Sequence, residues 1–196
     1  MPEQNRVTPL GDVVAVAARG RWMGNRGCLH DDRRRIVRHH AGKRWIICET
    51  DFRGRHMEQW RPGQYTVLYF HDEAVALAAG HRPCYQCRYR SYQAFFAAIG
   101  SRERADDLDA RLHVERWDGR GHPLHRMPWA AVPAGAFVVV DGVPSLVTDD
   151  AAVPWTTAGY DASSARARPR AGDATLVTPP LICQALTGGY VPQVSW

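Results

Sequence analysis

Residues 65–100 decide the fold, and they read YTVLYFHDEAVALAAGHRPCYQCRYRSYQAFFAAIG. The aromatic and β-branched run over 65–70 predicts a strand. Asp72 and Glu73 then open an alanine-rich run that stops at Gly80. Acidic residues in the first turn and a glycine at the end are typical of a short helix. This stretch therefore predicts a strand followed directly by a helix.

A second helix is expected from Pro83 to Gly100. Outside residues 65–100, the sequence predicts both helices and strands. A helix is predicted over 102–117, and another after Thr178, whose side chain is expected to cap it. The expected strands are 12–19, a hairpin with arms 35–38 and 45–48, a hairpin with arms 137–140 and 143–148, and 175–177. Pro144 should place the second arm of the later hairpin at a sheet edge or a bulge.

The composition is that of a globular chain, with 45% hydrophobic and 23% charged residues among 196. We find no apolar run of the roughly 18 to 20 residues that a membrane span needs, and no signal peptide at the N-terminus. We therefore expect a cytoplasmic protein without a membrane partner. A single α+β domain over 1–196 is expected, with a first part over 1–117 and a β-rich part over 118–196 as the alternative subdivision.

The cysteines are the main chemical feature of the sequence, and they stand at 28, 48, 84, 87 and 183. An odd number at irregular spacing in a reducing compartment favours metal binding or catalysis over disulfides. Cys84 and Cys87 form a C-x2-C pair at the start of the expected second helix, where two thiolates can share a tetrahedral Zn²⁺. A redox dithiol and two inert cysteines are the alternatives. The predicted fold is thus a small mixed sheet with a zinc-binding core, in which a strand, a helix, the C-x2-C pair and a second helix follow one another along the chain.

Two segments carry a resemblance to a known family. Residues 69–87 read YFHDEAVALAAGHRPCYQC, and residues 48–56 read CETDFRGRH. Both resemble the zinc module of the Ada family of alkylation-response proteins, which has "EALAAG", "RPC" and a C-x3-C followed by "RARH". The resemblance implies that Cys48, Cys84 and Cys87 bind zinc. It also implies that the Cys48 thiolate accepts a methyl group from a DNA phosphotriester, which is a DNA-repair activity.

One position departs from the family pattern, because Phe52 stands where the family has a metal-binding cysteine. The fourth ligand must then come from elsewhere, and His30 is the expected residue, with Cys28 as the alternative. The chain is also similar to uncharacterised bacterial proteins with "MGNRG", here residues 23–27, upstream of a histidine. A neutral histidine would make the cluster less negative and its sulfurs less nucleophilic than an all-cysteine site.

The charge of the chain is uneven. Residues 1–100 contain 16 basic and 9 acidic side chains, whereas residues 101–196 contain 9 and 11. Arginines near Trp22 and Trp45 suit phosphate contacts and base stacking, although a solvated basic face is the simpler interpretation. The expected nucleic-acid-binding residues, with DNA or RNA as partner, are Arg21, Arg26, Arg33, Arg34, Arg35, Arg38, Arg53 and Arg55.

Three functions are compatible with these features. The first is a zinc-containing nucleic-acid-binding protein in DNA repair or alkylation response. The second is a zinc-dependent enzyme, either an alkyl acceptor at Cys48 or a metal-activated hydrolase in which Glu49, Asp51 or His56 moves protons. The third is a structural zinc protein whose basic surface contacts another protein or RNA. Phosphate-binding glycine loops and nucleophile elbows are missing from the sequence, so kinase, dehydrogenase and α/β-hydrolase activities are not expected.

Overall fold

The computed structural model describes residues 1–54 and 58–196, and over these residues the chain is α+β, as expected. The helices are α1 (Glu73–Ala78), α2 (Tyr89–Ile99), α3 (Ala105–Arg116) and α4 (Pro180–Thr187), with 3-10 turns at Trp129–Ala131 and Ala162–Ser164. The strands are β1 (Gln4–Val7), β2 (Val13–Ala15), β3 (Trp22–Asn25), β4 (Ile46–Cys48), β5 (Leu68–Phe70), β6 (Arg82–Pro83), β7 (His125–Pro128), β8 (Phe137–Val140), β9 (Val143–Val147), β10 (Ala151–Thr156), β11 (Gly159–Tyr160), β12 (Arg166–Ala167) and β13 (Asp173–Leu176).

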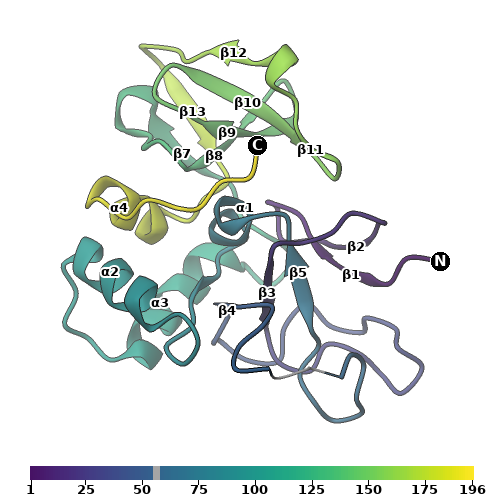
Figure 1. Cartoon of the computed structure of the whole chain (residues 1–196). Helices are drawn as coiled ribbons and strands as arrows, with labels where there is room; N and C mark the ends of the chain where they lie inside the picture. The colour runs from purple at the N-terminus through teal and green to yellow at the C-terminus, as the bar shows by residue number, and fades with distance from the viewer. Residues whose placement is uncertain (55–57) are drawn as a thin grey trace.

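The strands form two sheets. The first is mixed, with strand order β2-β1-β5-β3-β4-β6, and its parallel pairs are β1 with β5 and β4 with β6. The second is antiparallel, with order β11-β10-β9-β8-β13-β7 and with β12 beside β10. In Figure 1 the second sheet lies at the top, the first at the lower right, and α2 and α3 at the lower left.

The two sheets share one hydrophobic core. Every residue of α1 is buried, and in Figure 1 α1 lies between the two sheets, whereas α4 lies between the antiparallel sheet and the helices α2 and α3. One cluster of buried side chains contains Leu68 and Phe70 from the first sheet together with Val138 and Leu176 from the second. Burial of apolar surface across this junction therefore couples the mixed sheet to the antiparallel one.

The predicted hairpin between 35–38 and 45–48 is wrong. Strand β4 pairs instead with β3, antiparallel, and with β6, while Ile36 makes only an isolated bridge to His30. Gly24 allows the β3–β4 approach, because a Cβ there would lie 2.2 Å from the carbonyl oxygen of Ile46. The apolar β3 thus competes successfully for β4 against the charged segment over 35–38.

Three local expectations also differ from the structure. The second helix begins at Tyr89, because Arg82 and Pro83 form β6 against β4. Strand β9 lies between β8 and β10, so Pro144 stands in an interior strand. Thr178 does not cap α4, since its Oγ1 accepts a hydrogen bond from the Phe137 amide at 2.8 Å. None of the helices in the described residues has the length and apolar character needed to cross a membrane.

Candidate metal centre

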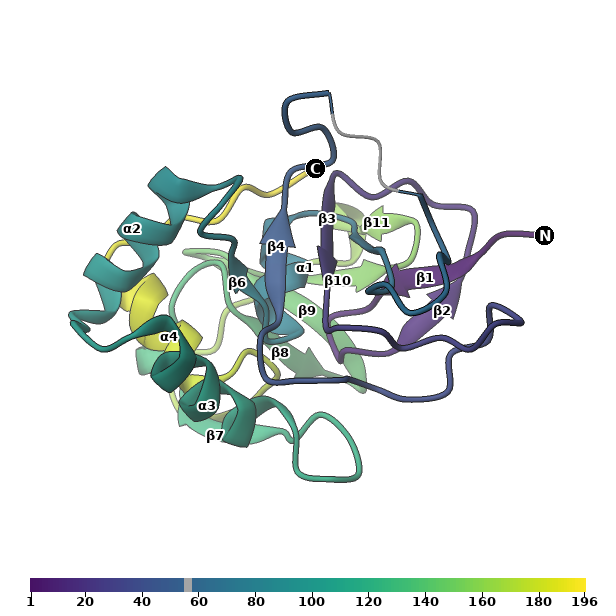
Figure 2. The same ribbon diagram turned by 90° about the horizontal axis from the view of Figure 1, so that it is seen from below.

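The parallel pairing of β4 and β6 brings two distant cysteines together. Ile47 stands opposite Pro83 in this register, so the next residues along the two strands are Cys48 and Cys84. The Cys84 amide donates to the Ile47 carbonyl oxygen at 2.9 Å, which holds the strand ends together. In Figure 2, β6 lies between β4 and the helices α2 and α3. Cys48 and Cys84 are therefore neighbours at one end of the mixed sheet.

A tight turn returns Cys87 to the same place. The turn over 85–87 is closed by a 3.1 Å hydrogen bond from the Arg88 amide to the Cys84 carbonyl oxygen. Cys48, Cys84 and Cys87 then form a group whose sulfur atoms lie within 4.8 Å of one another. This is the one group of three or more metal-ligating side chains among the described residues. The expected C-x2-C pair thus lies in a turn before the helix and not in its first turn.

Backbone amides from both segments point at these sulfurs. The Glu49 amide donates to Cys87 Sγ, and the Gln86 amide donates to Cys84 Sγ, each at 3.4 Å. Such donors favour the thiolate form. The side-chain hydrogen bond from Cys48 lowers the pKa of Cys84, and the same contact raises the pKa of Cys48. Three adjacent sulfurs cannot all ionise unless a cation compensates their charge.

The donor set fits zinc. Zinc is commonly bound by cysteine thiolates in tetrahedral geometry, and sites with three protein ligands leave the fourth position for water or substrate. Cys48, Cys84 and Cys87 line a cavity of about 160 Å³ that also contains Glu49, Thr50 and Phe52. A group of three thiols on the wall of a cavity can therefore hold a metal ion that stays accessible on one side.

The two residues expected to supply the fourth ligand lie outside this group. His30 Nδ1 is 2.7 Å from Thr66 Oγ1, and His30 Nε2 is 3.3 Å from the Arg61 carbonyl oxygen. Cys28 Sγ is 3.6 Å from the carbonyl oxygen of His30. The structure brings together the three expected cysteine ligands and does not bring His30 or Cys28 to them. The cavity instead adds residues that the sequence analysis did not name as candidate site residues: Met23, Asn25, Tyr65 and Gln86.

Arg88, the residue after Cys87, connects the C-x2-C turn to the protein interior. Its side chain is 1% exposed, its Nη1 lies 2.8 Å from Glu73 Oε1, and its guanidinium lies 3.9 Å from the centre of the Trp22 ring. Arg88 Nε also lies 3.9 Å from Glu49 Oε1, and the side chain of Glu49 is 39% exposed. Burial raises the pKa of Glu49. The turn that positions Cys84 and Cys87 is thus fixed to α1 through a buried ion pair.

Most of the arginines expected to bind nucleic acid are exposed. They are Arg21, Arg33, Arg34, Arg35, Arg38 and Arg53. Arg21 precedes β3 and lies at the Cys48 end of the β3–β4 pair, whereas 26–45 joins the opposite ends of these strands. Arg35 also pairs with Asp31 at 2.6 Å. Arg55 and His56 lie outside the described residues.

Arg26 is the exception, because it is fully buried. Its Nε donates to His81 Nε2 at 3.1 Å, and its guanidinium lies 4.2 Å from the centre of the Trp45 ring. Burial lowers the pKa of Arg26 to about 9. Arg26 therefore packs inside the protein, and the expectation that it lies on an exposed basic surface is wrong.

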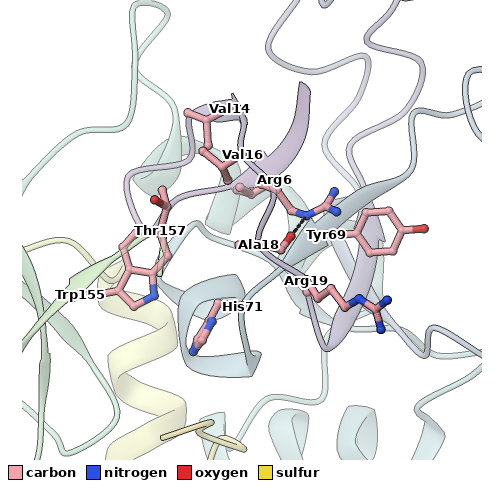
Figure 3. Close-up of a pocket in the computed structure, with 11 residues that line it drawn as sticks. Arg6, Val14, Val16, Ala18, Arg19, Tyr69, His71, Trp155 and Thr157 are labelled. Carbon is pink, nitrogen blue, oxygen red and sulfur yellow. Dashed lines mark hydrogen bonds between the residues drawn. The ribbon is translucent and has the colours of Figure 1, made fainter. Parts of the chain in front are cut away.

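A second, smaller cavity lies at the other edge of the mixed sheet (Figure 3). It measures about 20 Å³ and is lined by Val14, Val16, Trp155 and Thr157, with Arg6 and Arg19 beside it. The Trp155 Nε1–H is buried and has no hydrogen-bond partner among residues 1–54 and 58–196. A cavity of this size accommodates about one water molecule and is too small for a larger ligand. The cavity beside the cysteines is the candidate functional site because three potential metal ligands line it.

Comparisons with protein-family models, with curated proteins and with solved structures find no match for this chain. What stands of the Ada-type resemblance is the buried cluster of Cys48, Cys84 and Cys87 that can hold a metal ion.

Proposed function

We propose that the protein is a zinc-containing nucleic-acid-binding protein of the DNA-repair or alkylation-response type. The observation that carries the proposal is the group of three cysteine sulfurs within 4.8 Å of one another, open to a cavity of about 160 Å³. The cluster lies in the N-terminal half of the chain, where basic side chains outnumber acidic ones by 16 to 9. Phosphate backbones bind to surfaces of this charge.

Two features of the cluster support a resident metal. The three sulfurs lie close together although they come from two segments 36 residues apart. Without a metal ion, these three adjacent thiols could not all lose their protons. Zinc, once bound, keeps thiolates deprotonated at neutral pH and contributes to the folding free energy. Cys48, Cys84 and Cys87 would hold it, and the cavity would receive whatever occupies the fourth position.

The nucleic-acid part of the proposal is tested by salt-dependent binding. With about four phosphate contacts, the slope of log affinity against log salt on duplex DNA should lie near −3 to −4. Replacing Arg33, Arg34 and Arg35 together by alanine should flatten that slope. Replacing the exposed Arg126 and Arg166 of the antiparallel sheet provides the matched control and should leave it unchanged. Absence of binding at low salt, or a slope insensitive to the triple change, contradicts the proposal.

A second function is supported by the position of Cys48 on the cavity wall. We propose that its thiolate accepts a methyl group from a DNA methylphosphotriester. The sulfur attacks the methyl carbon, a sulfur–carbon bond forms, the carbon–oxygen bond breaks, and the phosphodiester leaves as an anion. Cys183 is a poor competitor, since burial in α4 raises its pKa to about 12.

Mass spectrometry after incubation with methylated DNA tests this transfer. One methyl group on Cys48 supports it. An unmodified protein that retains its metal and still binds DNA limits the function to binding. The Cys183→Ser variant should be methylated as the unaltered protein is, because Cys183 lies in α4 away from the cavity.

A further inference from the structure

A groove larger than the cysteine cavity runs beside it. Its volume is about 450 Å³, within the range of small-molecule sites, and its wall includes Arg44, Tyr85 and Arg104. Ile46, Cys84 and Gln86 line both the groove and the cysteine cavity. The segment over 84–86 thus separates the two spaces, and a molecule in the groove contacts the backbone that holds a candidate metal ligand.

Tyr85 is the most distinctive side chain of this groove. It lies inside the C-x2-C turn and is 61% exposed. Its ring contacts Tyr89 and Tyr92 edge-to-face, with ring centres 5.1 and 5.2 Å apart. Tyr89, in the first turn of α2, is itself 46% exposed. The ring of Tyr85 is therefore held in place by its neighbours while much of its surface faces solvent, as a stacking platform requires.

Two arginines on the same wall supply charge. Arg44 is 65% exposed and lies 2.9 Å from Asp106, and Arg104 is 85% exposed and lies 3.1 Å from Asp107. Ion pairs this exposed are weak, because water solvates both partners and salt screens them. Both guanidinium groups can therefore turn from a surface carboxylate to a phosphate, with which arginine makes paired hydrogen bonds.

We propose that this groove binds single-stranded nucleic acid, with one unpaired base stacked on Tyr85 and the adjoining phosphates on Arg44 and Arg104. The proposal rests on the nucleic-acid-binding function above and specifies the surface and the ligand. A base inside a duplex has no free face, so the ring of Tyr85 selects single strands. The bound strand lies next to the cysteine cavity through the shared segment over 84–86.

The test uses the full-length zinc-loaded protein and a fluorescein-labelled dT12 oligonucleotide, with anisotropy as the readout. Tyr85→Ala should weaken binding about five- to 150-fold, because stacking contributes about 1–3 kcal/mol per base. Tyr85→Phe retains the ring and should bind as the unaltered protein does. The double change of Arg44 and Arg104 to glutamine should weaken binding and lower the salt slope by about 1.4, the value for two phosphates on a single strand.

A matched control distinguishes binding in this groove from unspecific attraction to any exposed arginine. Arg126 and Arg166 are 78% and 69% exposed and are also ion-paired, and changing both to glutamine should leave dT12 binding unaltered. If the unaltered protein binds dT12 but Tyr85→Ala and the Arg44, Arg104 variant bind equally well, the groove proposal is overturned while nucleic-acid binding stands. If the unaltered protein binds neither dT12 nor duplex DNA, both proposals fail.

A competitor of another class decides between nucleic acid and an acidic peptide. Poly-glutamate of the same charge should displace dT12 weakly, because it offers no base for the Tyr85 ring. Equal displacement by poly-glutamate from the unaltered protein and from Tyr85→Ala would show that the groove recognises charge alone, which overturns the proposal.

Discussion

Asp109→Asn should destabilise the protein strongly, because Asp109 neutralises an arginine that holds the candidate metal centre in place. Arg82 belongs to β6, two residues before Cys84, and Asp109 belongs to α3. Arg82 Nε lies 2.9 Å from Asp109 Oδ1 and Arg82 Nη2 lies 2.6 Å from Asp109 Oδ2. The two side chains are 3% and 2% exposed. This paired contact fastens the helix to the strand that leads into the C-x2-C turn.

The expected loss of unfolding free energy in Asp109→Asn follows from the burial of both partners. Removing one partner of a buried pair leaves a desolvated charge and costs about 3–5 kcal/mol. Arg82 would keep a 3.1 Å hydrogen bond to the Pro83 carbonyl oxygen and its position 5.5 Å from the Tyr92 ring, neither of which neutralises it. At about 2–4 °C per kcal/mol for a chain of this size, the melting temperature should fall by about 6–20 °C.

The assay is thermal unfolding of the zinc-loaded protein, supported by urea titration. The Arg126–Asp173 contact is the control, because its side chains are 78% and 50% exposed. Asp173→Asn should change the unfolding free energy by less than about 1 kcal/mol. The double change Arg82→Met with Asp109→Leu should recover much of the loss, since no unpaired charge stays buried. An Asp109→Asn effect as small as that of Asp173→Asn would refute the reasoning.

Two further predictions concern pH and packing. Burial, and then the charge of Arg26, lower the pKa of His81, and burial lowers that of His122 to about 4, whereas unfolded histidines titrate near 6.5. As the pH falls below 6.5, the unfolded chain therefore binds more protons than the folded protein, and the folded protein loses stability. Calorimetry should show a lower melting temperature at pH 5 than at pH 7.5. The Cys84→Ser variant should show the same difference, because metal release cannot contribute there. An unchanged or higher value contradicts this. Gly24→Ala should lower the free energy of unfolding in urea by about 1–3 kcal/mol or more, since its Cβ would meet the Ile46 oxygen at 2.2 Å. Gly42→Ala should change it by less than about 0.5 kcal/mol, because among the described residues no atom beyond its chain neighbours would lie within 4 Å of the added Cβ. Equal effects at both glycines would contradict the close β3–β4 packing.

Local signals in the sequence were sufficient for several elements. Acidic residues and glycine mark the ends of α1. Asp72, which was expected in the first turn, is the N-cap residue and accepts a hydrogen bond from the Val75 amide at 2.9 Å. The hairpin predicted with arms 137–140 and 143–148 is confirmed, because β8 and β9 pair antiparallel on either side of Asp141 and Gly142. These predictions succeeded because each signal acts within a few residues of the element it ends or connects.

Long-range pairing could not be predicted in the same way. Strand β6 has two residues, and nothing in Arg82 or Pro83 indicates that they pair with Ile46 and Ile47. The meeting of Cys48 with the C-x2-C pair was expected from the Ada-type resemblance alone, and the register of β4 and β6 supplies its physical cause.

The surface was the least predictable part of the site. Arg26 lies in the same loop as exposed arginines, yet it is buried against Trp45. Arg44 and Arg104 are 60 positions apart in the sequence and line one groove. The charge of a side chain indicates what it can bind, but the tertiary fold decides whether it reaches solvent.

The metal content of the purified protein tests the central claim most directly. We expect about one Zn²⁺ per chain, X-ray absorption with three sulfur neighbours, and loss of the metal together with a lower melting temperature in Cys84→Ser. Cys183→Ser, which alters a buried cysteine outside the cluster, should keep its zinc. Protein that takes up no zinc when grown and refolded with it, or a Cys84→Ser variant that retains metal and melts as the unaltered protein does, would contradict the account.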